Sequence, residues 1–412
     1  MRVTIVGGGV IGLTTAYALI NKGHEVDLFE QNDDVGMATS FANGGQLSYR
    51  YVSPLADAGV PWQAVGWMLK QNSPLRFRPR ISLEQWRWCL QFLLACRSSV
   101  NQANTAHLLR LALHSQAVLH DWQAQFGLSD FAWRANGKMV VYRNGSHFNH
   151  AASKIAASSS QQVLTPQECV AAEPSLVDLA PQLQGGIFSP GDEVGDCYLF
   201  CQQLLQQLNA HPSFTLHTGQ IVKELVVERG KVRGLKLANN EVAVDHLVMA
   251  AGMGSVGLLN KVGVKVPLYP LKGYSLTLPV ADHATVPHTN VTDYDRKIVY
   301  ARLDNQLRVA AMVDIGNAST AIDANRIASL RHQAQLSFPK AGDYQQAQAW
   351  AGLRPATPQG TPLLGNSGIN NLWLNLGHGS LGFTLACASA SCLTQLINNE
   401  PPPIALTGLQ LN

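Results

Sequence analysis

The chain has 412 residues, of which 46% are hydrophobic and 14% charged, and its formal net charge is +3. This length favours two domains, and the composition excludes a disordered or fibrous protein. The small net charge without a basic tail argues against a nucleic acid partner, and the scattered cysteines argue against a metal site or a disulfide scaffold.

The start of the chain and its hydropathy predict a cytoplasmic protein. The first residues lead directly into a strand pattern, without the apolar segment and cleavage site of a secretion signal. No run reaches the roughly 18 consecutive apolar residues that a membrane-spanning helix needs. Reduced thiols in the cytoplasm are therefore the expected state of the cysteines.

The stretch MRVTIVGGGVIGLTTAYALINKGHEVDLFE follows the order strand, glycine-rich turn, helix, strand. In such a unit Gly7 permits the tight turn, Gly9 lets a pyrophosphate approach the backbone, and Gly12 lets the helix pack closely on the strand. The helix N-terminus then faces the phosphates. Glu30 would accept hydrogen bonds from ribose hydroxyls, which favours NAD or FAD. The motif alone does not choose between them, and a glycine-rich turn without a ligand is the alternative.

Residues 40–48, SFANGGQLS, form a second candidate for cofactor contact. Their small side chains would let the backbone approach a flat ring, and Asn43 and Gln46 carry amides to offer to it. A solvent-exposed loop explains the same residues equally well.

Residues 62–97 combine tryptophans with basic side chains and contain a single acid, Glu84. This mixture suits the headgroup zone of an anionic membrane surface. A helix packed on the core with a solvated basic face is the alternative. The residues concerned are Trp62, Trp67, Trp86, Trp88, Lys70, Arg76, Arg78, Arg80, Arg87 and Arg97.

Residues 244–255, VDHLVMAAGMGS, predict an apolar strand that closes with small residues. They end a segment whose alternation and turn residues predict a small β-meander. A strand returning to the nucleotide sheet would bring Ala251 and Gly252 near the adenosine end of the cofactor. A buried strand and turn without a ligand is the alternative.

Residues 371–397, NLWLNLGHGSLGFTLACASASCLTQLI, predict a strand that enters a glycine-lined turn and a long helix. The turn would receive the amides and the positive end of the helix dipole. Reduced flavin carries negative charge, so this element favours FAD over NAD.

The chain resembles the FAD-dependent D-amino acid oxidase superfamily, and within it the bacterial D-amino acid dehydrogenases of the small-subunit type. The stretches that carry the resemblance are VGGGVIGLTTAYAL, TSFANGGQLS, VPLYPLKGYSLTLP, GLRPATPQGTPLLG and LNLGHGSLGFTLACASA. The resemblance implies an α/β fold with a discontinuous Rossmann-like FAD-binding domain and an α+β substrate domain with a mostly antiparallel sheet. The expected FAD-binding segments are 1–50, 193–256 and 350–412, and the expected substrate-binding segments are 51–192 and 257–349.

The same resemblance implies the site residues. Arg354, in the GLRP stretch, is expected to bind a substrate carboxylate through its planar fork, with a structural arginine as the alternative. Tyr274 and Tyr300 are candidate second contacts, or ordinary strand tyrosines. His378 is expected to pack or hydrogen-bond beside the flavin rather than to act as a base. The expected cofactor contacts are Val6, Gly7, Gly9, Val10, Ile11, Gly12, Glu30, Gln31, Ser40, Asn43, Gly44, Gln46, Leu47, Val222, Ala251, Gly252, Gly352, Gly377, His378, Gly379, Ser380, Leu381, Gly382 and Thr384.

The implied reaction is oxidative deamination of a D-amino acid by hydride transfer from Cα to flavin N5, giving a 2-oxo acid and ammonia. FAD is expected to be noncovalent, because no cysteine stands where the resemblance places a flavin linkage. Electrons are expected to pass to a quinone or other respiratory acceptor, with the protein peripheral on the inner face of the cell membrane. An oxygen-using amine oxidase and an FAD-containing assembly protein without turnover are the alternatives.

Overall fold

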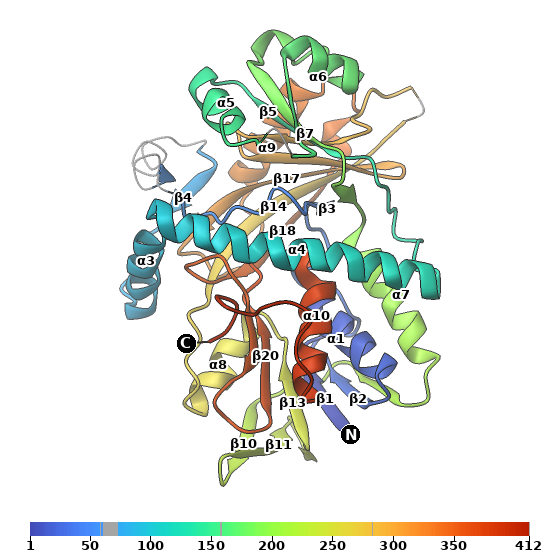
Figure 1. The fold of residues 1–412 in the computed structure, drawn as a ribbon, viewed down its shortest axis with the longest axis vertical. Helices are drawn as coiled ribbons and strands as arrows, with labels where there is room; N and C mark the ends of the chain where they lie inside the picture. Colours follow the sequence, from blue (N-terminus) through green and yellow to red (C-terminus); the bar gives the residue numbers. More distant parts are fainter. Residues whose placement is uncertain (58, 61–72, 157–158, 282, 412) are drawn as a thin grey trace.

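The computed structural model describes all residues except 58, 61–72, 157–158, 282 and 412. Two sheets form the two ends of the molecule, and the long helix α4 (Ser98–Phe126) runs across the middle (Figure 1). Both chain ends lie in the lower half of that view, beside the sheet that contains the first strand.

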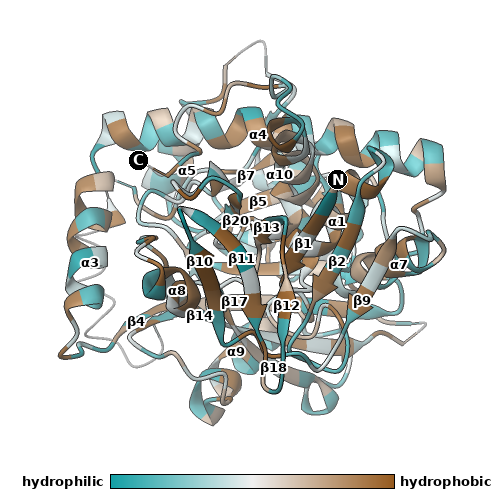
Figure 2. Ribbon diagram, turned by 90° about the horizontal axis from the view of Figure 1, so that it is seen from below, coloured by the Kyte–Doolittle hydropathy of each residue, from teal (hydrophilic) through white to brown (hydrophobic). Residues whose placement is uncertain are grey.

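The first sheet has six strands in the order β19-β20-β13-β1-β2-β9. All neighbours are parallel except β19, which pairs antiparallel with β20. Brown, apolar residues run along β1 at the centre of Figure 2, as expected of a parallel strand buried on both faces. The strands are β1 (Arg2–Val6), β2 (Glu25–Phe29), β9 (Phe214–His217), β13 (His246–Met249), β19 (Leu363–Asn366) and β20 (Leu372–Leu376).

Helices cover this sheet and share one hydrophobic core with α4. Leu108, Leu111 and Trp122 of α4 pack in that core, with α1 and α10 among its neighbours. Residues 98–126 therefore cover the first sheet, although they were predicted in the substrate-binding part. The other helices of this core are α1 (Val10–Asn21), α7 (Cys197–Asn209) and α10 (Gly382–Ile397), whereas α8 (Gly254–Lys261) packs in a separate core with β13.

The predicted meander is confirmed as a three-stranded antiparallel sheet beneath the first sheet (Figure 1). Its strands are β10 (Glu224–Glu228), β11 (Lys231–Lys236) and β12 (Glu241–Ala243). β13 follows and pairs parallel with β1, so the predicted return of this segment to the nucleotide sheet is also confirmed. A short two-stranded ladder joins β3 (Gln46–Leu47) to β8 (Glu193–Val194).

The other large sheet has nine strands, eight of them in the order β18-β14-β17-β16-β15-β5-β7-β6, with β4 paired to β17. It is mostly antiparallel, because only β15 with β5 and β4 with β17 run parallel. The strands are β4 (Leu75–Phe77), β5 (Lys138–Tyr142), β6 (Gln162–Leu164), β7 (Gly185–Ser189), β14 (Tyr269–Pro279), β15 (Asn290–Asp293), β16 (Ile298–Leu303), β17 (Gln306–Ile315) and β18 (Gln348–Ala356).

The nine-stranded sheet has two differently used faces. One packs on α9 (Ala324–Ser337) and forms the second core. The other meets residues 40–47, where Ser275 Oγ donates a hydrogen bond to the Ala42 carbonyl at 2.8 Å. We call it the loop face. Further helices of this part are α3 (Leu83–Ala95), α5 (Gly145–Ala152) and α6 (Pro166–Ala172).

Two of the predicted domain boundaries fall inside elements. Residue 350 lies within β18, which belongs to the nine-stranded sheet. The boundary between 256 and 257 lies within α8, whose Leu258 and Leu259 pack with β13. We therefore propose that the nucleotide-binding part continues past α8 and resumes only after β18.

Candidate active site

The glycine-rich loop adopts the close packing that its sequence predicted. Gly7 has φ +112°, a conformation that favours glycine. A Cβ on Gly12 would lie 1.8 Å from the Gly7 carbonyl oxygen, so the start of α1 sits directly against the end of β1. α1 begins after Gly9, which has no side chain to cap the helix, and Val10 N–H donates to Ser40 Oγ at 3.1 Å. The turn therefore fits a phosphate held on a helix N-terminus.

Glu30 stands at the end of β2, beside this loop. Its side chain is buried, and Gly8 N–H donates to its Oε2 at 2.6 Å. The backbone and side-chain amides of Asn32 donate to Oε1 at 2.9 and 2.6 Å. Because each carboxylate oxygen has more than one lone pair, the group is fixed in place and still able to accept from a ribose hydroxyl.

Most of the predicted cofactor contacts follow the carboxyl ends of adjacent parallel strands. These ends meet at one edge of the first sheet, which is where such sheets bind ligands. Val6 ends β1; after β1 and β2 come Gly7, Gly9, Val10, Ile11, Gly12, Glu30 and Gln31; after β13 come Ala251 and Gly252; after β20 come Gly377, His378, Gly379, Ser380, Leu381, Gly382 and Thr384. Val222 lies between β9 and β10, and Gly352 lies on β18 in the other sheet.

The loop over residues 40–47 joins the two sheets, and the Gln46 side chain bonds to the protein itself. Gln46 Nε2 donates to the carbonyls of Val291 and Tyr300 at 3.2 and 3.3 Å. Asn43 Oδ1 accepts from Gly45 N–H at 2.9 Å. The predicted use of the Gln46 amide toward a flat ring is therefore wrong, whereas the prediction for the Asn43 amide stays a prediction, and the backbone of the loop is a further candidate contact.

His378 is a buried neutral imidazole. Burial lowers its pKa to about 3, and its Nε2 lies 2.9 Å from Ser389 Oγ on α10. The turn around it is held by a hydrogen bond from Gly379 N–H to the Pro355 carbonyl at 3.0 Å. A group with this pKa is not a proton acceptor at neutral pH, so the geometry supports packing rather than base catalysis.

Arg354 projects from β18 onto the loop face. It lies opposite Leu271 in the ladder with β14, and cross-strand partners point to the same side. Its Nη1 donates to the Met312 carbonyl at 3.0 Å. No carboxylate of the described residues forms an ion pair with it. Burial without a counter-charge lowers the pKa of the guanidinium to about 10.

Tyr274 and Tyr300 face away from Arg354, because the side chains of a strand alternate between its two faces. Tyr274 donates to Asp314 at 2.9 Å, and Tyr300 packs edge-on against Phe338 after α9. The prediction that these tyrosines bind the same carboxylate as Arg354 is therefore wrong for this structure. Both belong to the core beneath α9.

Some site residues were missed from sequence. Gly8 holds Glu30, and its place in the glycine run was the available signal. Met312 holds Arg354 through its carbonyl, for which the sequence has no signal. Gly273 lies against the guanidinium of Arg354. It precedes Tyr274 in the KGYS stretch, in which the sequence indicated only the tyrosine as a candidate.

Comparisons with known proteins agree with this geometry. Residues 2–396 match the family model described as DAO, FAD dependent oxidoreductase. The chain belongs to this family. FAD is accordingly its cofactor, and the protein is an oxidoreductase.

Curated relatives and solved structures extend the comparison. The chain is 52% identical to D-amino acid dehydrogenase 2 of Pseudomonas aeruginosa over 408 residues, 99% of this chain and 97% of that protein. It is 40% identical to D-amino acid dehydrogenase 2 of Ralstonia nicotianae, over 98% of both chains. Glycine oxidase from Geobacillus kaustophilus shares the fold with a TM-score of 0.77 and 21% identity, over 100% of this chain and 98% of that one. L-proline dehydrogenase from P. horikoshii shares the fold with a TM-score of 0.76 and 14% identity, over 100% of this chain and 96% of that one.

Substitution of Gly12 tests the nucleotide loop. Gly12→Ala should abolish FAD retention, because the added Cβ meets a backbone oxygen that has no room to move. The absorbance ratio of flavin to protein after purification measures this. Gly257→Ala, in α8 with open space around the new methyl, is the control. Normal flavin content in Gly12→Ala would contradict the assignment of the loop.

The buried imidazole of His378 predicts a pH dependence of stability. Its folded pKa of about 3 lies below the ordinary 6.5, so its contribution is complete above pH 6.5 and is lost as the pH falls toward 3. Between pH 7.5 and 5.5 the wild type should lose about 1 kcal/mol more unfolding free energy than His378→Gln. Urea unfolding of both holoproteins measures the difference, and parallel pH curves would refute a neutral His378.

Proposed function

We propose that the protein oxidises D-amino acids to 2-oxo acids and ammonia, and that Arg354 binds the substrate carboxylate. The names of the curated relatives support the substrate class. The observation that carries the proposal is a largely desolvated guanidinium without an acidic partner among the described residues, on the loop face. A carboxylate bound there would supply the missing charge in bidentate geometry.

Arg354 and His378 have different roles in the proposed reaction. The Met312 carbonyl accepts a hydrogen bond from Nη1 of Arg354, which leaves Nη2 and Nε for a substrate carboxylate. FAD held by the glycine-rich loop and Glu30 would supply the hydride acceptor for the substrate Cα. His378 does not compete for the amine proton, because its pKa is about 3. Hydride transfer from a neutral amine needs no side-chain base, so orientation by Arg354 is the main contribution of the chain.

Arg354→Ala tests this role. Loss of the buried charge pair should cost about 3 to 5 kcal/mol, or roughly 10² to 10³ in kcat/KM, with normal FAD content. Arg354→Lys should recover only part, since one ammonium cannot reproduce the fork. The measurement is anaerobic flavin reduction against D-amino acid concentration. An alanine variant with unchanged rate and half-saturation would remove Arg354 from the site.

The acceptor is proposed to be a quinone or another respiratory carrier rather than oxygen. Oxygen uptake during turnover separates the two: a dehydrogenase reduces an added quinone much faster than it consumes oxygen. Stoichiometric oxygen consumption with hydrogen peroxide release would instead favour an amine oxidase.

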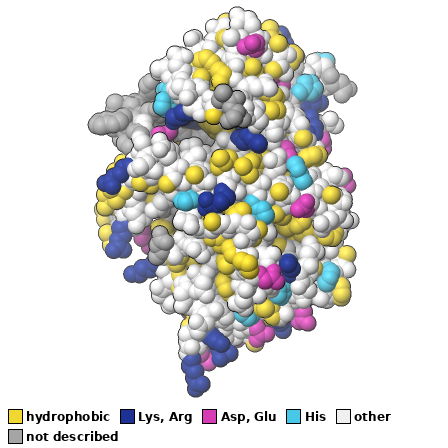
Figure 3. All heavy atoms as spheres, in the orientation of Figure 1, with side chains coloured by type: hydrophobic (Ala, Val, Ile, Leu, Met, Phe, Trp, Pro, Cys, Tyr) yellow, Lys and Arg dark blue, Asp and Glu magenta, His cyan; other side chains and the backbone are white. Residues whose placement is uncertain are grey.

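We further propose that α3 binds an anionic membrane surface. One face of the helix is apolar and exposed, with Leu83, Leu90 and Trp86 at 70%, 60% and 51% exposure. Exposed Arg87 and Arg97 flank this stripe, and Figure 3 shows yellow and dark blue side chains together over α3 at the left edge. Apolar and cationic side chains on one exposed face suit a headgroup region. No helix of the described residues is long and apolar enough to span a membrane.

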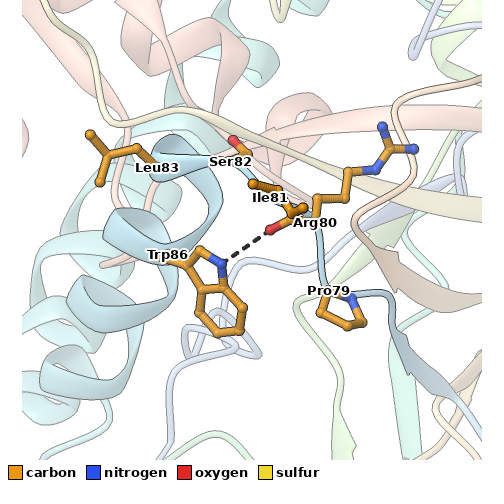
Figure 4. A pocket seen from close by; sticks show the side chains of 6 residues that line it. All are labelled: Pro79, Arg80, Ile81, Ser82, Leu83 and Trp86. Carbon is orange, nitrogen blue, oxygen red and sulfur yellow. Dashed lines mark hydrogen bonds between the residues drawn. The ribbon is translucent and has the colours of Figure 1, made fainter.

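The start of α3 adds a shallow apolar hollow to this face. It is lined by Pro79, Arg80, Ile81, Ser82, Leu83 and Trp86, with the Trp86 indole donating to the Arg80 carbonyl at 3.1 Å (Figure 4). Ile81 is fully exposed at its rim. Such a side chain gains most from insertion among lipid chains.

Several residues of the predicted lipid-binding segment have structural roles instead. Trp88 is buried and donates to the Ala356 carbonyl at 2.9 Å. Arg76 pairs with Asp323 at 2.8 Å, and Arg80 Nε donates to the Gly316 carbonyl at 2.6 Å. For these three the expected lipid contact is wrong. Trp62, Trp67 and Lys70 lie outside the described residues.

Charge reversal tests the membrane surface. Arg87→Glu with Arg97→Glu should weaken sedimentation with anionic phosphatidylglycerol vesicles by roughly 30-fold, at about 1 kcal/mol per cation. Arg229→Glu with Lys231→Glu, at the far β10–β11 turn, should have little effect and is the control (Figure 1). Equal binding by both variants, or no binding by the wild type at low salt, would refute the proposal that α3 binds an anionic membrane.

A further inference from the structure

We propose that Gly273 is a positioning residue that aims the guanidinium of Arg354 at the substrate carboxylate. The inference rests on the proposed role of Arg354 and names the backbone feature that makes this role geometrically feasible. It assigns to Gly273 an effect on carboxylate binding, although Gly273 has no side chain to contact a ligand.

The guanidinium lies directly against the backbone of Gly273. A Cβ built there would be 2.4 Å from Nη2, 2.5 Å from Cζ and 2.6 Å from Nη1 of Arg354. In the regular ladder between β14 and β18, Gly273 faces Gly352 and Leu271 faces Arg354, so all four lie on the loop face. Only a residue without a side chain leaves the guanidinium its observed place.

A β-bulge fixes the other side of the guanidinium. The pairing of β14 with β17 shifts between Lys272 and Tyr274, so Gly273 stands where the ladder is interrupted. Met312, opposite the interruption, has φ +69°, which is costly for a side chain of this size. This conformation accompanies the carbonyl that accepts from Arg354 Nη1 at 3.0 Å. Bulges often reorient groups beside active sites, and strain persists where the surroundings enforce it.

Together the two strands fix one face and one nitrogen of the guanidinium. Gly273 supports its flat face, and the Met312 carbonyl holds Nη1. Among the described residues neither Nη2 nor Nε has a hydrogen-bond acceptor, and these two atoms are the pair that a carboxylate binds in a fork. Pre-set orientation of the charge is what Gly273 contributes to affinity.

Gly273→Ala separates this function from folding. Gly273 does not have a positive φ, so the backbone tolerates alanine. The atoms closest to the new methyl all belong to the end of one flexible side chain, that of Arg354. The substitution should therefore displace the guanidinium and leave the sheet intact.

The experiment is a double-mutant cycle on the holoenzyme. Anaerobic flavin reduction is followed with the fastest substrate of a panel of D-alanine, D-phenylalanine and D-arginine, for wild type, Gly273→Ala, Arg354→Ala and the double variant. Gly273→Ala should raise the half-saturating concentration at least tenfold and change the limiting rate by less than threefold. In the Arg354→Ala background the same substitution should change half-saturation by less than twofold. Gly257→Ala is the control for a harmless methyl.

The outcomes are distinct. An unchanged half-saturation in Gly273→Ala, or penalties that multiply in the double variant, would overturn the role of Gly273. An unchanged Arg354→Ala would instead refute the proposed function on which this role rests. If Gly273→Ala loses FAD, its combination with Arg354→Lys decides. Recovery of FAD shows that the clash with the guanidinium was the cause, and continued loss overturns the proposal.

Discussion

A buried ion pair at the junction of the two sheets holds the site together. Arg308 on β17 lies 3.2 Å from Asp196, and both side chains are almost fully buried. Asp196 also caps α7, and Arg308 donates to the Asn43 carbonyl at 2.9 Å. One charge pair thus connects the nine-stranded sheet, a helix of the first sheet and the loop over residues 40–47. Breaking such a pair typically costs about 3 to 5 kcal/mol, because the remaining charge stays buried.

This junction gives the nine-stranded sheet two unequal faces. Beneath α9, Arg326 pairs with Asp314 at 2.7 Å, and Tyr274 donates to the same carboxylate. On the loop face, Arg354 has only a carbonyl partner. A satisfied network stabilises a core, whereas an uncompensated cation beside a cofactor site is arranged for a ligand. The contrast within one sheet separates structural from functional charge.

The sequence was sufficient where function depends on local geometry. The spacing of Gly7, Gly9 and Gly12 predicted the turn and its close contact, because these follow from neighbours along the chain. It was insufficient where function depends on strand register. Tyr274 follows Gly273 along β14, so its side chain points to the face opposite the loop face, and only the pairing of β14 with β18 shows this. The amide of Gln46 was likewise bound by strands some 250 positions away, at Val291 and Tyr300. The bulge at Met312 has no signature in residue type.

The central claim is that Arg354 is a cation prepared for a substrate carboxylate. The most direct measurement is a crystal structure of the holoenzyme with a bound carboxylate ligand such as benzoate. The account predicts both carboxylate oxygens at about 2.7 to 2.9 Å from Nη2 and Nε of Arg354, with Nη1 still bonded to the Met312 carbonyl. A carboxylate bound elsewhere, with Arg354 unchanged and bonded only to Met312, would contradict it.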